Sequence, residues 1–288
     1  MTPAPLDRRS FLIGSAALAA SAVLPRPAPA ADADPYGGFT VGVQSYTFRN
    51  FDLEGMLKRT KELGLTHAEF YQKHIPMGSD GDKLKAIQKL LAEYGVTAVA
   101  YGVEGFTKDH DANKKKFDFG AALGIKAFSA DPNPDSLDSL DKLVAEYKIA
   151  IAIHPHGPVG KGMHRWRDAE SILKAVKDHH ALVGTCLDTG HLIRAAQLDI
   201  KLDPAEQVTI MGARNFGLHL KDHDNKRKTD VPFGDATGVL DVAAVLKALK
   251  AVKFAGFISI EYEAKADNPT ADVKACLDYL KVAIKKLG

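Results

Sequence analysis

The chain has 288 residues, of which 45% are hydrophobic and 26% are charged, a composition typical of a globular protein. Its formal net charge is only +2 at pH 7. This near balance argues against nucleic acid or an anionic membrane surface as its partner.

The first 30 residues have the pattern of a twin-arginine export signal. Arg8 and Arg9 precede an apolar stretch over 11–24, and Ala28-Pro29-Ala30 offers a small-x-small cleavage site. The stretch is too short to span a bilayer, and no cysteine follows it, so we expect no stable membrane anchor. We therefore predict a periplasmic protein with a cleaved signal over 1–30 and a short lead over 31–39.

Short β-like runs then alternate with amphipathic helical stretches over 40–288. The predicted strands span 40–46, 66–70, 97–103, 126–130, 148–153, 182–187, 215–220 and 256–260. The predicted helices span 53–63, 83–94, a lysine-rich stretch ending at 123, 137–146, 167–179, 204–211, 242–252 and 270–287. Glycines at 64, 95 and 124 stand where helices should end. Eight such repeats predict an α/β fold, a single (β/α)₈ TIM barrel in one domain over 40–288.

Residue alternation within the later strands places polar residues on one face. On the fifth strand Ile149, Ile151 and Ile153 share a face, whereas His154 lies on the opposite face with two alanines. The same register puts three more polar residues at the ends of the next strands: Asp188, His219 and Glu261. The large aliphatic side chains should pack under the helices, so the smaller face should point to the barrel axis.

These four residues are 34, 31 and 42 positions apart, close to one strand plus one helix per step. A single His or Asp at a strand end is more often an ordinary loop residue. Four in one register predict a shared divalent-metal site at the C-terminal mouth, where barrel active sites lie. Imidazole with carboxylate suits Mn²⁺, Zn²⁺, Fe²⁺ or Co²⁺ better than Ca²⁺.

Three neighbours should line the same mouth as catalytic or substrate-binding groups. His156 can hydrogen-bond substrate or act as a base, or it can be a loop histidine. His191 can hold a substrate hydroxyl or cap the following helix. Lys221 can stabilise an enolate oxygen, or act as a base if its pKa is depressed; its structural alternative is a salt bridge to Asp222.

Further candidates come from the strand ends and loops around them. Gln44 and Glu69 end the first and second strands, and each can touch substrate or be structural. Trp166 follows the fifth strand, where it can stack on a sugar ring or pack at a helix N-terminus. Cys186 and Cys276 are expected to be buried and unpaired, although the periplasm would permit a disulfide.

The motifs together resemble the sugar phosphate isomerase/epimerase family, the xylose isomerase-like barrels. The resemblance covers about 40–287 and rests on four segments, which are Gly42-Val43-Gln44-Ser45-Tyr46, Leu187-Asp188-Thr189-Gly190-His191, His219-Leu220-Lys221-Asp222 and Ile258-Ser259-Ile260-Glu261. It implies one divalent ion, Mn²⁺ above all, with Zn²⁺, Co²⁺, Fe²⁺ or Mg²⁺ as alternatives. Asp188, His219 and Glu261 match the family's ligands, but His154 stands where the family has a glutamate.

The resemblance implies removal of a proton next to a carbonyl on a small carbohydrate, with Glu261 as one of the family's proton-transferring glutamates. Because His154 replaces the other glutamate, it puts the two-glutamate epimerase mechanism in doubt. A periplasmic member is expected to act on free sugars or glycosides rather than sugar phosphates. The alternatives are a lyase or hydratase acting on 3-keto-glycosides, with His156 or Lys221 as base, a non-catalytic sugar-binding barrel and, more weakly, a metal-dependent endonuclease. A homo-oligomer remains open.

Overall fold

The computed structural model describes residues 34–287. The predicted export signal and its cleavage site lie outside the described residues. Within the described part of the chain, no helix is long and apolar enough to cross a membrane.

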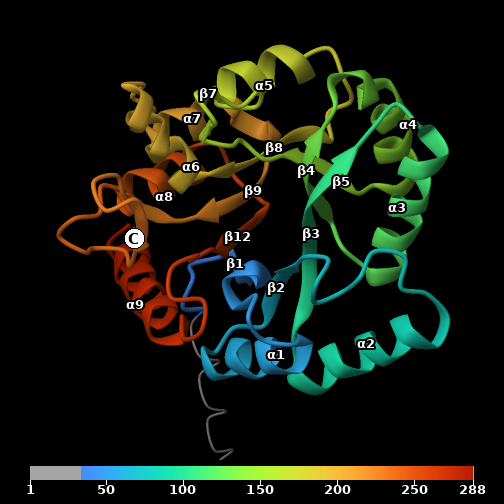
Figure 1. Cartoon of the computed structure of the whole chain (residues 1–288), viewed down its shortest axis with the longest axis horizontal. Helices are drawn as coiled ribbons and strands as arrows, with labels where there is room; N and C mark the ends of the chain where they lie inside the picture. The colour runs from blue at the N-terminus through green and yellow to red at the C-terminus, as the bar shows by residue number, and fades with distance from the viewer. Residues whose placement is uncertain (1–33, 288) are drawn as a thin grey trace, which may run out of the picture. The chain divides into compact units, whose positions relative to one another are not determined.

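Eight parallel strands close into a barrel at the centre of the fold (Figure 1). They are β1 (Thr40–Gln44), β2 (His67–Phe70), β3 (Thr97–Phe106), β4 (Ala127–Pro132), β5 (Ala150–Ile153), β8 (Val183–Asp188), β9 (Asn215–Leu220) and β12 (Phe257–Ile260). Their order around the barrel is β1-β12-β9-β8-β5-β4-β3-β2, and β2 pairs with β1 to complete the circle. The predicted (β/α)₈ barrel is confirmed.

Helices surround the barrel, as Figure 1 shows. They are α1 (Leu53–Glu62), α2 (Gly81–Tyr94), α3 (His110–Leu123), α4 (Leu137–Tyr147), α5 (Ala169–Val176), α6 (Thr189–Arg194), α7 (Pro204–Met211), α8 (Val242–Ala251) and α9 (Thr270–Lys286). Short 3₁₀ turns cover η1 (Ser45–Phe48), η2 (Pro134–Ser136), η3 (Ala195–Leu198) and η4 (Gly212–Arg214). Glycine was expected at the ends of these helices. Gly95 and Gly124 are indeed the C-caps of α2 and α3, with left-handed φ values of 68° and 84°.

Two hairpins at the mouth and the short helix α6 were not predicted. The first hairpin pairs β6 (Pro158–Val159) with β7 (Gly162–Met163), and the second pairs β10 (Asp222–Asp224) with β11 (Thr229–Val231). Each of these strands has only two or three residues, too few for alternation to reveal a face.

The strand faces follow the predicted alternation. Ala150, Ala152 and Cys186 form a small-residue cluster with Phe257, separate from the main core. The aliphatic residues Ile149, Ile151, Val183, Leu187, Leu218, Ile258 and Ile260 belong to the main core together with the apolar faces of the helices. Both cysteines are buried and unpaired, as predicted.

Candidate functional site

The four predicted metal ligands converge at the C-terminal mouth of the barrel. His154 directly follows β5, Asp188 and His219 pair in register across β8 and β9, and Glu261 directly follows β12. One donor atom from each lies within 4.8 Å of the others, and all four side chains are buried. The strand register thus brings together residues that are up to 107 positions apart in the sequence.

The spacing of their donor atoms fits a common cation. His154 Nε2 lies 3.0 Å from His219 Nδ1 and 3.4 Å from Asp188 Oδ2, while His219 Nδ1 lies 3.2 Å from Glu261 Oε2. Ligands held at about 2.1 Å from one ion are about 3.0–3.4 Å apart. The donor set therefore suits a divalent ion of the zinc or manganese type.

Glu69 orients one of these ligands from below. Its Oε2 accepts hydrogen bonds from His219 Nε2 at 2.7 Å and from Ser259 Oγ at 2.9 Å. In the neutral imidazole with its proton on Nε2, Nδ1 of His219 would direct its lone pair at the other ligands. Of the two roles considered for Glu69, substrate contact and a structural role, its complete burial and its hydrogen bond to His219 favour the structural one.

The two carboxylate oxygens of Asp188 have different surroundings. Oδ1 accepts a hydrogen bond from the backbone N–H of His191 at 2.7 Å and so caps the N-terminus of α6. Oδ2 is buried and makes no hydrogen bond of normal geometry within the described part of the chain; it forms an ion pair with Lys221 Nζ at 3.2 Å and lies 3.4 Å from His154 Nε2. A buried carboxylate oxygen without a hydrogen bond is the kind of atom that a metal ion satisfies.

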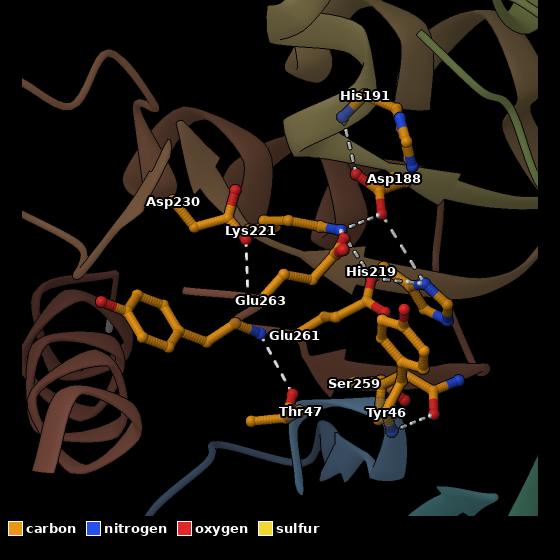
Figure 2. A network of polar contacts seen from close by, with 12 residues as sticks. Tyr46, Thr47, Asp188, His191, His219, Lys221, Asp230, Ser259, Glu261 and Glu263 are labelled. Carbon is orange, nitrogen blue, oxygen red and sulfur yellow. Dashed lines mark hydrogen bonds and ion pairs between the residues drawn. The ribbon is translucent and has the colours of Figure 1, made fainter. Parts of the chain in front are cut away.

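Lys221 lies among three carboxylates, those of Asp188, Glu261 and Glu263 (Figure 2), instead of forming the considered salt bridge to Asp222. Its Nζ is 3.2 Å from Asp188 Oδ2, 2.8 Å from Glu261 Oε2 and 2.5 Å from Glu263 Oε1. Burial opposes its charge, but these carboxylates outweigh burial and raise the pKa of Lys221 well above its ordinary value. Lys221 is thus a buried ammonium with its donors in use, unlike the base with a depressed pKa that we considered.

The site has a surplus of negative charge. Asp188, Glu261 and Glu263 face the charge of Lys221 at close range, and Glu69 faces His219. Burial disfavours the His219 imidazolium, but Cys186, Glu69 and Glu261 favour it more strongly, so the pKa of His219 is raised well above its usual range. Burial would raise the pKa of Glu261, yet Lys221 and His219 lower it to about 2. Both shifts reflect the attraction between the acidic and the basic side chains of this site.

A cavity of about 310 Å³ opens beside the four candidate ligands, two of which, His154 and Glu261, line it. Of the predicted substrate-binding and catalytic residues, Gln44, His156, His191 and Glu261 line it. Trp166 does not: it is buried, and its Nε1 donates to the carbonyl of Pro132 at 2.9 Å, so it anchors the loop after β7. A larger, mostly apolar cavity of about 470 Å³ lies at the opposite end of the barrel and contains none of the predicted site residues.

Two tyrosines on the wall of the cavity of about 310 Å³ were not predicted. Tyr46 and Tyr71 follow β1 and β2, and their rings meet edge to face with centroids 5.2 Å apart. Tyr46 stands in the first family-like motif, two residues beyond Gln44. Both tyrosines lie just beyond the end of a strand, and this position is the sequence signal that predicts a residue at the barrel mouth.

Burial lowers the pKa of two histidines on the wall, His156 and His191, which favours their neutral forms. Burial, together with His154 and His164, lowers the pKa of His156 to about 4. Burial and Lys221 hold the pKa of His191 well below its usual range, against the opposing effect of Asp188. His191 Nδ1 accepts the backbone N–H of Gly157 at 3.1 Å, so its proton is on Nε2 and can be donated.

The fold and the site define a (β/α)₈ barrel with a candidate metal centre at the mouth. The chain belongs to the family described as the xylose isomerase-like TIM barrel, whose model matches residues 57–282. No functionally curated protein matches the sequence.

Solved structures with the same fold include sugar epimerases. An uncharacterised protein from Parabacteroides distasonis ATCC 8503 is 27% identical, with a TM-score of 0.65 over 84% of this chain and 98% of that one. An L-ribulose 3-epimerase is 16% identical, with a TM-score of 0.65 over 86% and 95% of the two chains. A 3-keto-D-glucoside 4-epimerase from E. coli is also 16% identical, with a TM-score of 0.65 over 85% and 99%. At these identities the likeness to the two epimerases establishes a common fold.

Proposed function

We propose that the protein is a divalent-metal-dependent enzyme of the sugar isomerase/epimerase type. The observation that carries the proposal is the convergence of four donor side chains within 4.8 Å, beside a cavity of about 310 Å³ that His154 and Glu261 line. A cavity of this size suits a single sugar unit. The epimerases with the same fold support carbohydrate as the substrate class.

His154, Asp188, His219 and Glu261 would hold the ion. When bound, it would polarise a substrate carbonyl oxygen and so acidify the adjacent C–H. The remaining groups of the site then have to position the sugar and take the proton.

Glu261 is the proposed proton acceptor, because it borders the cavity and matches one of the family's two proton-transferring glutamates. Lys221 fixes this carboxylate at 2.8 Å and holds Glu263, further out on the wall, at 2.5 Å. His191 offers its Nε2–H to a sugar oxygen. Tyr46 and Tyr71 present ring edges and faces against which a pyranose can pack.

His154 favours reactions that need a single base. Epimerisation with two glutamates needs one group that removes the proton from one face of the substrate carbon and a second that returns a proton to the opposite face. An imidazole whose lone pair holds a metal can fill neither role. We therefore keep a second candidate function, a lyase or hydratase acting on 3-keto-glycosides, since elimination needs one base. The likeness to a 3-keto-D-glucoside 4-epimerase supports the same substrate class.

We further propose export through the twin-arginine route, based on Arg8, Arg9 and the apolar stretch after them. A periplasmic location favours free sugars or glycosides over phosphorylated sugars. Cell fractionation tests this: replacing both arginines by lysine should trap the protein in the cytoplasm, whereas unchanged export would contradict the proposal.

Incubation of metal-loaded protein with free ketoses and 3-keto-glycosides in D₂O tests the reaction. An isomerase or epimerase should introduce deuterium next to the carbonyl, and a lyase should also release the aglycone. Saturable sugar binding without exchange across the panel would instead identify a non-catalytic sugar-binding barrel.

A further inference from the structure

A second group of metal-binding side chains lies on the rim of the mouth, beside the first. Asp131 lies in β4, His156 follows β5, and His164 follows β7. One donor atom from each lies within 4.8 Å of the other two, and none of the three belongs to the first ligand set. The His156 and His154 ring centroids are 4.8 Å apart, so the two groups are neighbours.

The carboxylate of Asp131 is already positioned for this task. Arg165 Nη2 donates to Oδ1 at 2.8 Å, which leaves Oδ2 facing His164 Nε2 at 3.6 Å. A carboxylate that is fixed through one oxygen and offers the other is typical of a supported metal ligand.

His156 supplies an imidazole whose Nδ1 has no hydrogen-bond partner within the described part of the chain. Its Nδ1 is buried and makes no hydrogen bond, and such a polar atom calls for an explanation. Its backbone N–H donates to the carbonyl of Trp166 at 2.8 Å, which ties it to the loop that carries His164. The His156 and His164 ring centroids are 4.8 Å apart.

His164 is held in place by the loop between β7 and α5. The buried Trp166 anchors this loop through Pro132, and the Trp166 N–H lies 3.3 Å from His164 Nδ1. If Nε2 bound a metal ion, the proton of the His164 ring would be on Nδ1, and Nδ1 could no longer accept from the Trp166 N–H. The loss would be small, because at 3.3 Å this hydrogen bond is longer than usual.

We propose that Asp131, His156 and His164 form a second divalent-metal site, with a borderline ion such as Zn²⁺ or Co²⁺ as its ligand. Two imidazoles and one carboxylate suit these ions better than Ca²⁺ or Mg²⁺. Three protein ligands leave a coordination position open, as in catalytic zinc sites.

A rival grouping of His154, His156 and His191 is less suited to an independent ion. His154 is committed to the first ligand set, and His191 Nδ1 already accepts the Gly157 amide.

His156 lines the cavity, so the open position of the rim ion would face the sugar and bind one of its oxygens. Only this last role rests on the proposed function.

The experiment counts bound metal in the full-length protein after chelation, with Zn²⁺ as the probe. Calorimetry and elemental analysis should give two equivalents in the wild type and one in His164→Ala. Asp188→Ala should lose the other equivalent. With Co²⁺, the wild type minus His164→Ala difference spectrum should show the absorption of a separate nitrogen- and oxygen-ligated ion.

A matched control is His179→Ala, because His179 and Asp141 form another partly exposed His–Asp pair, 2.8 Å apart. This variant should keep both equivalents. Asp131→Asn retains an acceptor for Arg165 but loses the anionic ligand, and serves as the second rim variant if His164→Ala folds poorly. A single equivalent in the wild type, or two in folded His164→Ala or Asp131→Asn, would overturn the proposal. These counts are independent of turnover, so a failure of the proposed reaction leaves the test intact.

Discussion

Removal of the Glu69 carboxylate should weaken metal binding although Glu69 is not a ligand. In Glu69→Ala, His219 Nε2 and Ser259 Oγ lose the acceptor that they share at 2.7 and 2.9 Å. The His219 ring is then free to turn or change tautomer, so Nδ1 no longer faces the other ligands in every molecule.

The expected loss is about 10–100-fold in metal affinity, the usual effect of removing a carboxylate behind a ligating histidine. That corresponds to about 1.4–2.8 kcal/mol of binding free energy. Glu69→Gln should lie between the wild type and Glu69→Ala, because the amide oxygen can still accept the His219 proton but carries no charge.

Competition between the protein and a chromogenic chelator for Zn²⁺ measures this affinity. Asp222→Asn is a suitable control, since Asp222 is another buried carboxylate but accepts only from the backbone N–H groups of His223, Val239 and Leu240. If folded Glu69→Ala binds Zn²⁺ as tightly as the wild type, the assignment of Glu69 as the orienting group is refuted.

The remaining predictions concern the ligands, the loop anchor and pH. Asp188→Ala and His219→Ala should abolish metal retention at the mouth site, and an undiminished metal content after purification would reject this ligand set. Trp166→Phe should lower the free energy of unfolding by about 1–2 kcal/mol through the lost hydrogen bond, measured in urea, with unchanged sugar affinity if Trp166 is structural. Burial lowers the pKa of His74, so below pH of about 6.5 the unfolded state takes up a proton first and stability falls; His74→Gln should flatten this decline. His154→Glu should increase epimerase activity, measured by product stereochemistry, if the histidine diverts the chemistry.

The barrel and the convergence of the four ligands could be predicted because both depend on local periodicity. Alternation within a strand assigns each side chain to a face, and the strand–helix repeat places successive strand ends at one mouth. His154, Asp188, His219 and Glu261 each follow from these two regularities alone.

The role of Glu69 depends on barrel closure, which no local pattern reveals. Glu69 and His219 are 150 positions apart, and β1 and β12 separate their strands in the barrel. Their contact crosses the interior, so the sequence could place Glu69 at a strand end but could not identify its partner.

Lys221 and Trp166 show the same limit for charge and packing. The raised pKa of Lys221 comes from carboxylates on β8 and after β12, and these become neighbours only in the folded protein. Trp166 is buried because the short β6–β7 hairpin turns its loop back toward Pro132. Neither environment is encoded in the residues adjacent to these positions.

We propose that the mouth site uses a divalent ion to remove a proton next to a sugar carbonyl. The most direct measurement is deuterium incorporation from D₂O into a bound keto-sugar, followed by NMR before chelation, after chelation and after reloading with Mn²⁺ or Zn²⁺. We predict that exchange stops on chelation, returns on reloading and is absent from Asp188→Ala. Exchange that continues at the same rate in metal-free protein would contradict the account.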